Sequence, residues 1–224
     1  MKVIVTIPAY NEERTIGRVI EEIKKVMDKA KHNYKIVVVD DGSSDNTVRI
    51  AKEAGAIVYT NKRNKGLAET FKEEMRQCLK LNADIIVHTD ADGQYPPEYI
   101  PEMINSVIEG YDLVLGSRFG KGIYSGSISK KLGNQFFAKI ISLILRKNIY
   151  DTTTGFRAFT KEIAQLPIES KFTYTQEQLI RTLRLKKNVK EIPIIARKTR
   201  ESRLFSNIFE YFYRAVFTLF KIFI

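Results

Sequence analysis

Residues 85–94 of this chain are Ile85-Ile86-Val87-His88-Thr89-Asp90-Ala91-Asp92-Gly93-Gln94. The apolar start predicts a buried strand, in which His88 is a core residue. The two carboxylates then emerge where that strand ends, which is the end at which open α/β sheets bind ligands. Carboxylate and amide oxygens are hard donors that suit Mg²⁺ or Mn²⁺ bridging to a diphosphate. Asp-x-Asp by itself often marks a solvated turn, so its position after a strand is what favours a metal site.

Strand and helix patterns alternate on both sides of this stretch. Apolar runs predict strands at 2–7, 35–39, 56–60, 84–89 and 112–116, and amphipathic patterns predict helices at 13–30, 46–54, 66–80 and 98–109. A Gly/Ser-rich loop at 120–129 follows, then helices at 130–146 and near 174–186 and a strand at 189–195. This order predicts an α/β fold with a mostly parallel sheet flanked by helices.

The chain has 224 residues, enough for one sizeable domain, and a net charge of +11. Basic residues are concentrated between Arg181 and Arg203, where nine Lys and Arg residues stand against two Glu residues. Such a charge attracts nucleic acid, an anionic membrane surface or phosphorylated substrates. A nucleic-acid-binding protein is a minor alternative, because the sequence has no recognised nucleic-acid motif and its acidic strand-end loops would repel phosphates without a metal. The single cysteine, Cys78, excludes an internal disulfide.

Polar loops follow the other predicted strands of the first half. Their sequences are Pro8-Ala9-Tyr10-Asn11-Glu12, Asp40-Asp41-Gly42-Ser43 and Asn64-Lys65-Gly66. A parallel sheet brings the carboxyl ends of its strands to one edge, so we expect these loops to meet the Asp-x-Asp loop there. Tyr10 would be suited to covering a base or ribose, and Asp41 to accepting hydrogen bonds from a base edge.

Residues 206–224 form a tail rich in Phe. Its polar residues follow one narrow helical stripe: Asn207, Glu210, Arg214, Thr218 and Lys221. Two interpretations stay open. The tail is either a helix packed into the core or an oligomer interface, or an amphipathic helix that lies in a membrane interface with its Phe side down. A helix that spans the bilayer is disfavoured, because its charged residues are costly there.

These motifs together resemble the family 2 glycosyltransferases of the GT-A fold, which is Rossmann-like. Within that family the chain is similar to the polyprenyl-phosphate hexose synthases, the dolichyl-phosphate mannose synthase group. Further segments continue the match: Asp92-Gly93-Gln94-Tyr95-Pro96-Pro97-Glu98, Gly116-Ser117-Arg118, Asp151-x-x-x-Gly155-Phe156 and Glu201-Ser202-Arg203-Leu204. The resemblance covers residues 1–205 and implies a glycosyltransferase domain there. For residues 206–224 we expect, from the polar stripe alone, a membrane-interface helix.

The resemblance also implies a role for each matching residue. The nucleotide-sugar site would consist of Pro8, Tyr10, Glu12, Val39, Asp41, Asp90, Ala91, Arg118, Arg200 and Arg203. Asp92 and Gln94 would ligate Mg²⁺ or Mn²⁺. Arg118, Lys130 and Lys131 would bind the acceptor phosphate, and the catalytic residues would be Asp92, Arg118 and Lys130. The chain departs from the family in two places: Lys130-Lys131 stands where an Arg-Lys pair is common, and Arg200 and Arg203 replace a Gly and a Lys.

The implied reaction is an inverting, metal-dependent transfer of a hexose, with mannose favoured, to a polyprenyl or dolichyl phosphate. The donor would be a nucleotide sugar, either GDP-mannose or a UDP-hexose. We expect a peripheral enzyme at the cytoplasmic face of a membrane, with a possible membrane-protein partner and no nucleic acid. The alternative is a family 2 glycosyltransferase that acts on a hydroxyl acceptor of a glycan or small molecule.

Overall fold

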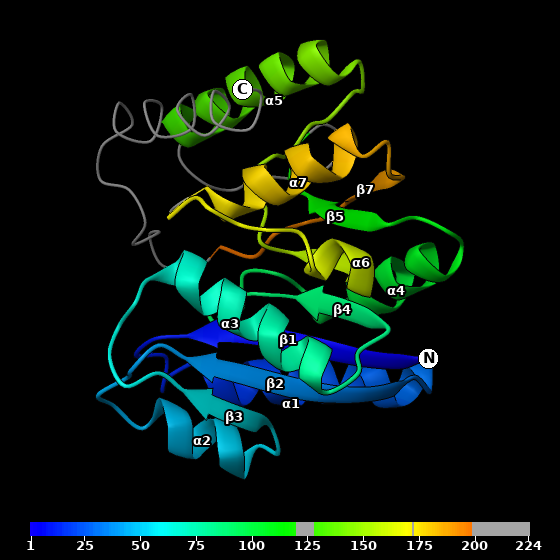
Figure 1. The fold of residues 1–224 in the computed structure, drawn as a ribbon. Coiled ribbons are helices and arrows are strands. Elements are labelled where there is room, and N and C mark those ends of the chain that lie inside the picture. The colour runs from blue at the N-terminus through cyan, green and yellow to red at the C-terminus, as the bar shows by residue number, and fades with distance from the viewer. Residues whose placement is uncertain (120–127, 172, 199–224) are drawn as a thin grey trace.

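The computed structural model describes residues 1–119, 128–171 and 173–198, with the backbone alone for 128–132 and 145. In these residues seven strands form one sheet in the order β3-β2-β1-β4-β6-β5-β7 (Figure 1). Their bounds are β1 Lys2–Ala9, β2 Asn33–Asp40, β3 Ile57–Thr60, β4 Ile85–His88, β5 Leu113–Ser117, β6 Arg157–Thr160 and β7 Val189–Pro193. Adjacent strands are parallel except where β6 lies antiparallel between β4 and β5. The predicted mostly parallel sheet is therefore confirmed.

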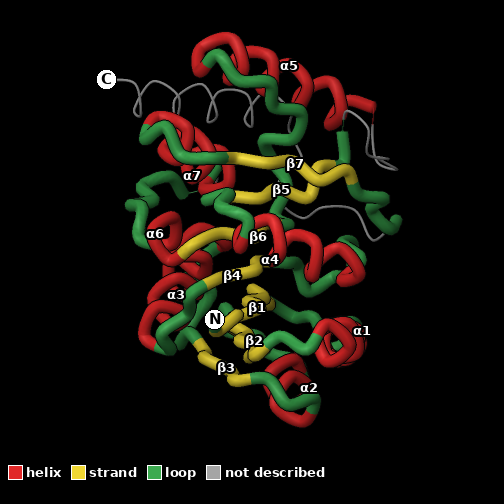
Figure 2. Tube along the Cα trace, turned by 90° about the vertical axis from the view of Figure 1, so that its right-hand side faces the viewer, coloured by secondary structure: helices red, strands yellow, loops and turns green. Residues whose placement is uncertain are grey.

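Helices cover both faces of the sheet (Figure 2). They are α1 Ile16–Ala30, α2 Thr47–Glu53, α3 Leu67–Lys80, the 3₁₀ turn Pro97–Tyr99, α4 Ile100–Ile108, α5 Ile128–Leu145, α6 Lys161–Ala164 and α7 Tyr174–Arg184. Because successive strand residues point to opposite faces, Val3 and Val5 pack with α1 and α4, whereas Ile4 packs with α3 and α7. Burial on both faces explains the continuous apolar runs of the central strands.

The sequence patterns did not predict strand β6. It has four residues, and the first of them, Arg157, is a charged residue that is fully buried. A short segment that begins with Arg has neither the alternation nor the apolar run by which strands are predicted. Its inclusion between β4 and β5 depends on backbone pairing with both neighbours, with Arg157 opposite His88 on one side and Leu115 on the other.

The antiparallel direction of β6 has a consequence for the site. Parallel pairing places Ala9 beside Asp40 and Thr6 beside His88, so β1, β2 and β4 end at one edge of the sheet. Strand β6 begins at that same edge, because Arg157 pairs with His88. The turn that precedes β6, residues 151–156, is thereby brought to the edge where the loops after β1, β2 and β4 meet.

Candidate functional site

The Asp-x-Asp loop is a tight turn directly after β4. The Oδ1 atom of Asp92 accepts a hydrogen bond from the backbone N–H of Gln94 at 2.9 Å. Gly93 has a φ of 75°, a left-handed conformation that favours glycine. The carbonyl of Gln94 accepts from the backbone N–H of Arg197 at 2.9 Å, so the segment after β7 lies against this loop. Ala91 is buried, whereas Asp90, Asp92 and Gln94 retain exposed surface.

The pKa of Asp90 responds to its burial and to the charges around it. The pKa of Asp90 is raised to about 6, first because desolvation disfavours its charged form and second because Asp92 is also negative. The positive charges of His88 and Arg118 act in the opposite direction. The loop therefore concentrates negative charge at a strand end where a cation would be stabilised.

The predicted nucleoside residues gather at the ends of β1 and β2. Pro8, Glu12 and Val39 are buried, and Tyr10 is exposed at 40% of its surface. The loops are joined to one another, since the backbone N–H of Glu12 donates to Thr47 at 2.7 Å and that of Asn11 donates to Ser43 at 2.8 Å. The exposed ring of Tyr10 is thus carried on a well-anchored loop at the expected edge.

Asp41 has a role within the protein that the sequence did not predict. Its carboxylate accepts hydrogen bonds from the side chain of Asn61 at 2.9 Å and from the backbone N–H groups of Lys65 and Gly66 at 2.9 and 2.8 Å. Gly42 packs close to this loop: a Cβ on it would lie 2.8 Å from the carbonyl carbon of Arg63. Asp41 therefore ties the loop after β3 to the end of β2. Its placement in a nucleoside pocket stays a prediction.

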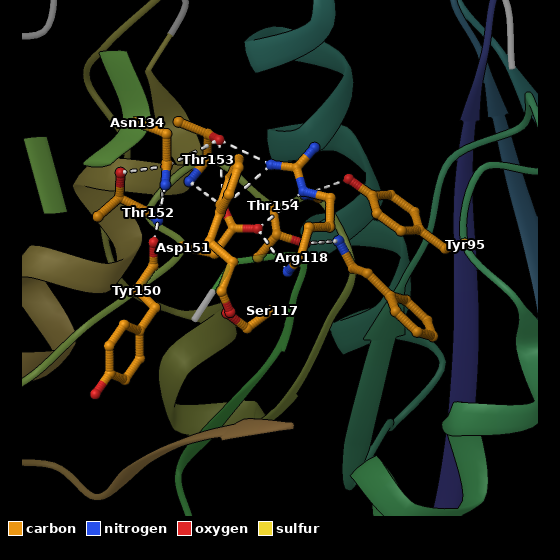
Figure 3. A network of polar contacts seen from close by, with 12 residues as sticks. Tyr95, Ser117, Arg118, Asn134, Tyr150, Asp151, Thr152, Thr153 and Thr154 are labelled. Carbon is orange, nitrogen blue, oxygen red and sulfur yellow. Dashed lines mark hydrogen bonds and ion pairs between the residues drawn. The ribbon is translucent and has the colours of Figure 1, made fainter. Parts of the chain in front are cut away.

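Arg118 is held by the turn that precedes β6 (Figure 3). Its Nε atom contacts Oδ2 of Asp151 at 2.8 Å, and its Nη2 atom donates to Oδ1 of Asp151 at 3.1 Å and to Thr153 at 2.8 Å. Only 11% of the Arg118 side chain is exposed, and none of Asp151. A two-pronged guanidinium–carboxylate pair of this kind fixes the plane of the arginine.

The same turn is anchored from other sides. Burial by itself would raise the pKa of Asp151, but the charge and hydrogen bonds of Arg118 hold that pKa below its usual value. Glu191 of β7 accepts hydrogen bonds from the backbone N–H groups of Tyr150 and Asp151, both at 2.9 Å. Arg157 donates to the carbonyl of Thr154 at 2.8 Å from the interior. The acidic partner of Arg118 is therefore rigidly placed.

Asn134 joins helix α5 to this turn (Figure 3). It is buried, its side-chain amide donates to the carbonyl of Tyr150 at 2.8 Å, and its oxygen accepts from the hydroxyls of Thr152 and Thr153 at 3.2 Å. Lys130 and Lys131 lie near the start of the same helix. Asn134 thus connects the helix that carries the predicted acceptor lysines to the turn that holds Arg118.

Several predicted residues do not meet this edge or lie outside the described part of the chain. Arg181, Lys187 and Lys190 of the basic segment form ion pairs with the carboxylates of Glu177, Asp112 and Glu109. Asp112 directly precedes β5, so the Lys187–Asp112 ion pair lies at the edge of the sheet opposite to the candidate site. Lys187, which lies between α7 and β7, therefore does not contribute to the candidate site. Arg200, Arg203 and the tail 206–224 lie outside the described residues.

The sequence also left functional neighbours unrecognised. Asp151 was part of a matching motif without an assigned role, and Asn134 and Glu191 were not singled out. The signal that marks Asn134 is its helical spacing of three, four and seven residues from the apolar residues Phe137, Ala138 and Ile141, which are buried with it. Such residues are retained in cores when their hydrogen bonds are satisfied, as they are here.

Comparison with known proteins agrees with this geometry. The family described as "Glycosyl transferase family 2" matches residues 4–166. A dolichyl-phosphate hexose transferase of Haloferax volcanii is 32% identical, and the match covers 85% of this chain and 80% of that protein. A UDP-N-acetylglucosamine–dolichyl-phosphate N-acetylglucosaminyltransferase of Methanococcus voltae is 32% identical, and the match covers 84% of this chain and 82% of that protein. An undecaprenyl-phosphate mannosyltransferase of Micrococcus luteus is 28% identical, and the match covers 93% of this chain and 89% of that protein.

Solved structures share the fold. The glucosyl-3-phosphoglycerate synthase of Mycobacterium tuberculosis, crystallised with Mn²⁺, uridine diphosphate and phosphoglyceric acid, superposes with a TM-score of 0.77 at 22% identity. The match covers 98% of this chain and 78% of that one. The architecture is thus the Rossmann-like GT-A fold. From the family match and these sequence identities together, the chain belongs to glycosyl transferase family 2 and is a glycosyltransferase.

Proposed function

We propose that this enzyme transfers a hexose, with mannose favoured, from a nucleotide sugar to a polyprenyl or dolichyl phosphate. The observation that carries the proposal is the meeting of two turns at one edge of the sheet. One is the acidic Asp90–Gln94 turn, and the other is the 151–156 turn that holds Arg118. A cation-dependent diphosphate site and an anion-binding arginine are the two parts that such a transfer needs. The names of the relatives in Haloferax and Micrococcus support a lipid phosphate as the acceptor.

The residues at the acidic turn fit a divalent cation that is shared with the substrate. Within the described residues, no group of three or more His, Cys, Asp or Glu side chains is arranged to hold a metal. Mg²⁺ is commonly held by one or two carboxylates together with substrate phosphates, and not by an all-protein cage. Asp92 and Gln94 would supply the protein oxygens, and Mn²⁺ is equally suited to them. When bound, the cation would stabilise the negative charge that develops on the leaving diphosphate.

Arg118 and Lys130 would hold the acceptor phosphate in line behind the anomeric carbon. A phosphate monoester is already anionic near neutral pH, so its attack requires no strong general base. Correct placement of the two reactants then supplies much of the rate enhancement. A single displacement of this kind inverts the anomeric configuration. Tyr10, on its anchored loop, would cover the nucleoside of the donor.

A donor panel tests this proposal. The full chain is incubated with GDP-mannose, UDP-glucose and UDP-N-acetylglucosamine, each with Mn²⁺ or Mg²⁺ and a short polyprenyl phosphate, and release of the nucleoside diphosphate is measured. We expect release that requires both the cation and the lipid phosphate, with GDP-mannose preferred. Release that is independent of the lipid phosphate for every donor would contradict the proposal.

Lys130→Ala is expected to raise the KM for polyprenyl phosphate about 10- to 100-fold, because one charge-assisted contact contributes about 1.5–3 kcal/mol. The KM for the nucleotide sugar should stay unchanged. Lys139→Ala is the matched control, since Lys139 is an exposed lysine farther along the same helix. Equal effects of the two substitutions on the acceptor would show that Lys130 has no particular role.

We also propose that the tail 206–224 docks the enzyme on the cytoplasmic surface of a membrane. Among the described residues no helix is both long and apolar enough to cross a bilayer. The Phe-rich side of the tail would bury apolar surface, and each basic residue would add about 1 kcal/mol of attraction to anionic lipid. A chain that ends at Leu204 should remain in the supernatant when the full chain sediments with anionic liposomes. Equal sedimentation of the two would refute the docking role.

A further inference from the structure

The peptide of Gly155 is fixed from two sides. Its N–H donates to the hydroxyl oxygen of Tyr95 at 3.1 Å, and its carbonyl lies 2.6 Å from Nδ1 of His88. Tyr95 is itself held by stacking on Phe156, with ring centroids 5.2 Å apart. Tyr95 lies on the loop after β4 and His88 on β4, so two neighbouring segments hold one peptide group.

Gly155 in turn lies directly against Asp90. A Cβ on Gly155 would be 3.0 Å from Oδ1 of Asp90 and 3.4 Å from Oδ2. The φ of Gly155 is outside the left-handed region, so an L residue could adopt its backbone conformation. A Cβ at these distances would be in tighter contact than is usual, so the Asp90 carboxylate would have to shift by a few tenths of an ångström. The position of this peptide therefore determines where Asp90 can lie.

His88 is connected on its other side to a second buried group. A carbonyl oxygen only accepts hydrogen bonds, so Nδ1 of His88 must carry the proton that bonds Gly155. Nε2 then faces Oε2 of Glu74 at 3.4 Å, while Oε1 of Glu74 accepts from the hydroxyl of Thr6 at 2.9 Å. His88 and Glu74 are both fully buried. Burial lowers the pKa of His88, but Glu74, Asp90 and the Gly155 carbonyl act together in the opposite direction, so the pKa lies above its usual value.

We propose that His88 is a positioning residue of the transfer: together with Tyr95 it fixes the Gly155 peptide, which sets the Asp90 carboxylate for the ribose and diphosphate of the donor. His88 would act without touching the donor. The buried carboxylate of Glu74 lies on the other side of the imidazole, 3.4 Å from Nε2, while Nδ1 faces the Gly155 carbonyl. This inference rests on the proposed function, because it assigns the effect of His88 to nucleotide binding.

Two substitutions separate positioning from packing. His88→Asn places an amide N–H near the position of Nδ1 and retains the bond to Gly155, whereas His88→Gln places its amide near Nε2 and loses that bond. Both are made together with Glu74→Gln, so that no buried carboxylate is left without a counter-charge. The Asn variant loses more volume and leaves the larger cavity, so a purely structural role predicts that it is the worse of the two.

The measurement is calorimetric binding of UDP and GDP, each with Mn²⁺, with Glu74→Gln alone as the reference. We expect the affinity of Glu74→Gln/His88→Asn to stay within about threefold of the reference. The affinity of Glu74→Gln/His88→Gln should fall about tenfold, as is common when the support of a ligand-binding group is removed. The more weakly folded variant would then be the better binder.

Equal affinities of the two double variants, or weaker binding by the Asn variant, would overturn the positioning role and leave the proposed function intact. Absence of binding of either nucleotide by the wild-type enzyme would overturn the proposed function and this inference with it. If one of the double variants does not fold, the variant Tyr95→Phe tests whether a fixed Gly155 peptide is needed for nucleotide binding. It removes the other anchor of Gly155 but keeps the stacked ring, and nucleotide affinity equal to that of the wild type would refute the inference.

Discussion

Asp92→Asn is expected to reduce sugar transfer by about 10²–10³-fold or more and to remove the Mn²⁺ dependence of nucleotide binding. The substituted amide still offers an oxygen to the backbone N–H of Gln94, so the turn after β4 is preserved. What is lost is the charge that would hold the cation, whose stabilisation of the leaving diphosphate amounts to several kcal/mol. The fold should be unaffected, because Asp92 lies at the strand ends and outside the core.

Calorimetric titration of UDP or GDP, with and without Mn²⁺, measures this effect. Asp84→Asn is the matched control, since Asp84 is an exposed carboxylate at the opposite end of β4. The control should bind nucleotide with the same Mn²⁺ dependence as the wild type. Identical Mn²⁺-dependent binding by Asp92→Asn would show that the cation is held elsewhere.

Arg118→Ala is expected to lower the free energy of unfolding by about 3–5 kcal/mol, because it leaves the fully buried Asp151 without its ion-pair partner. The double variant Arg118→Ala/Asp151→Ala should be more stable than Arg118→Ala alone, since the isolated charge is then absent. Urea denaturation of the wild type, both single variants and the double variant measures the coupling between the two residues. Additive effects would mean that the pair does not act as a unit.

The same pair predicts a pH dependence. The pKa of Asp151 in the folded protein lies below its ordinary value of 3.8. A depressed carboxyl pKa contributes stability that is present above the ordinary value and is lost as the pH falls through the folded pKa. The stability difference between the wild type and Asp151→Asn should therefore shrink below about pH 4. A difference that persists unchanged to lower pH would contradict the assignment of the stabilisation to this ion pair.

The position of a strand in the sheet could be predicted where the residue types of that strand alone determine it. Strands such as β2 contain continuous β-branched residues, and these can be buried on both faces only in the interior of a sheet. Once those strands are parallel, the convergence of their polar loops follows, and the pairing of Ala9 with Asp40 confirms it for β1 and β2. Whether each residue there binds the donor stays a prediction.

The sequence was uninformative where the environment depends on distant segments. Arg118 was assigned to phosphates, but its immediate partner is Asp151, which is 33 residues away in the turn that precedes the antiparallel strand β6. The hydrogen bonds of Asp41 to the loop after β3 depend likewise on how that loop folds back over Gly42. Charged side chains can serve either a ligand or the protein, and only the fold shows which protein groups lie within reach.

The proposed acceptor of the enzyme is a lipid phosphate. The most direct test compares a polyprenyl phosphate with the corresponding polyprenol, with the full enzyme, Mn²⁺ and a labelled nucleotide sugar, and measures label in the organic phase. We expect label with the phosphate and none with the alcohol, because the anionic acceptor supplies its own nucleophile and would be held by Arg118 and Lys130. Transfer to the alcohol but not to the phosphate would show that the acceptor group is a hydroxyl.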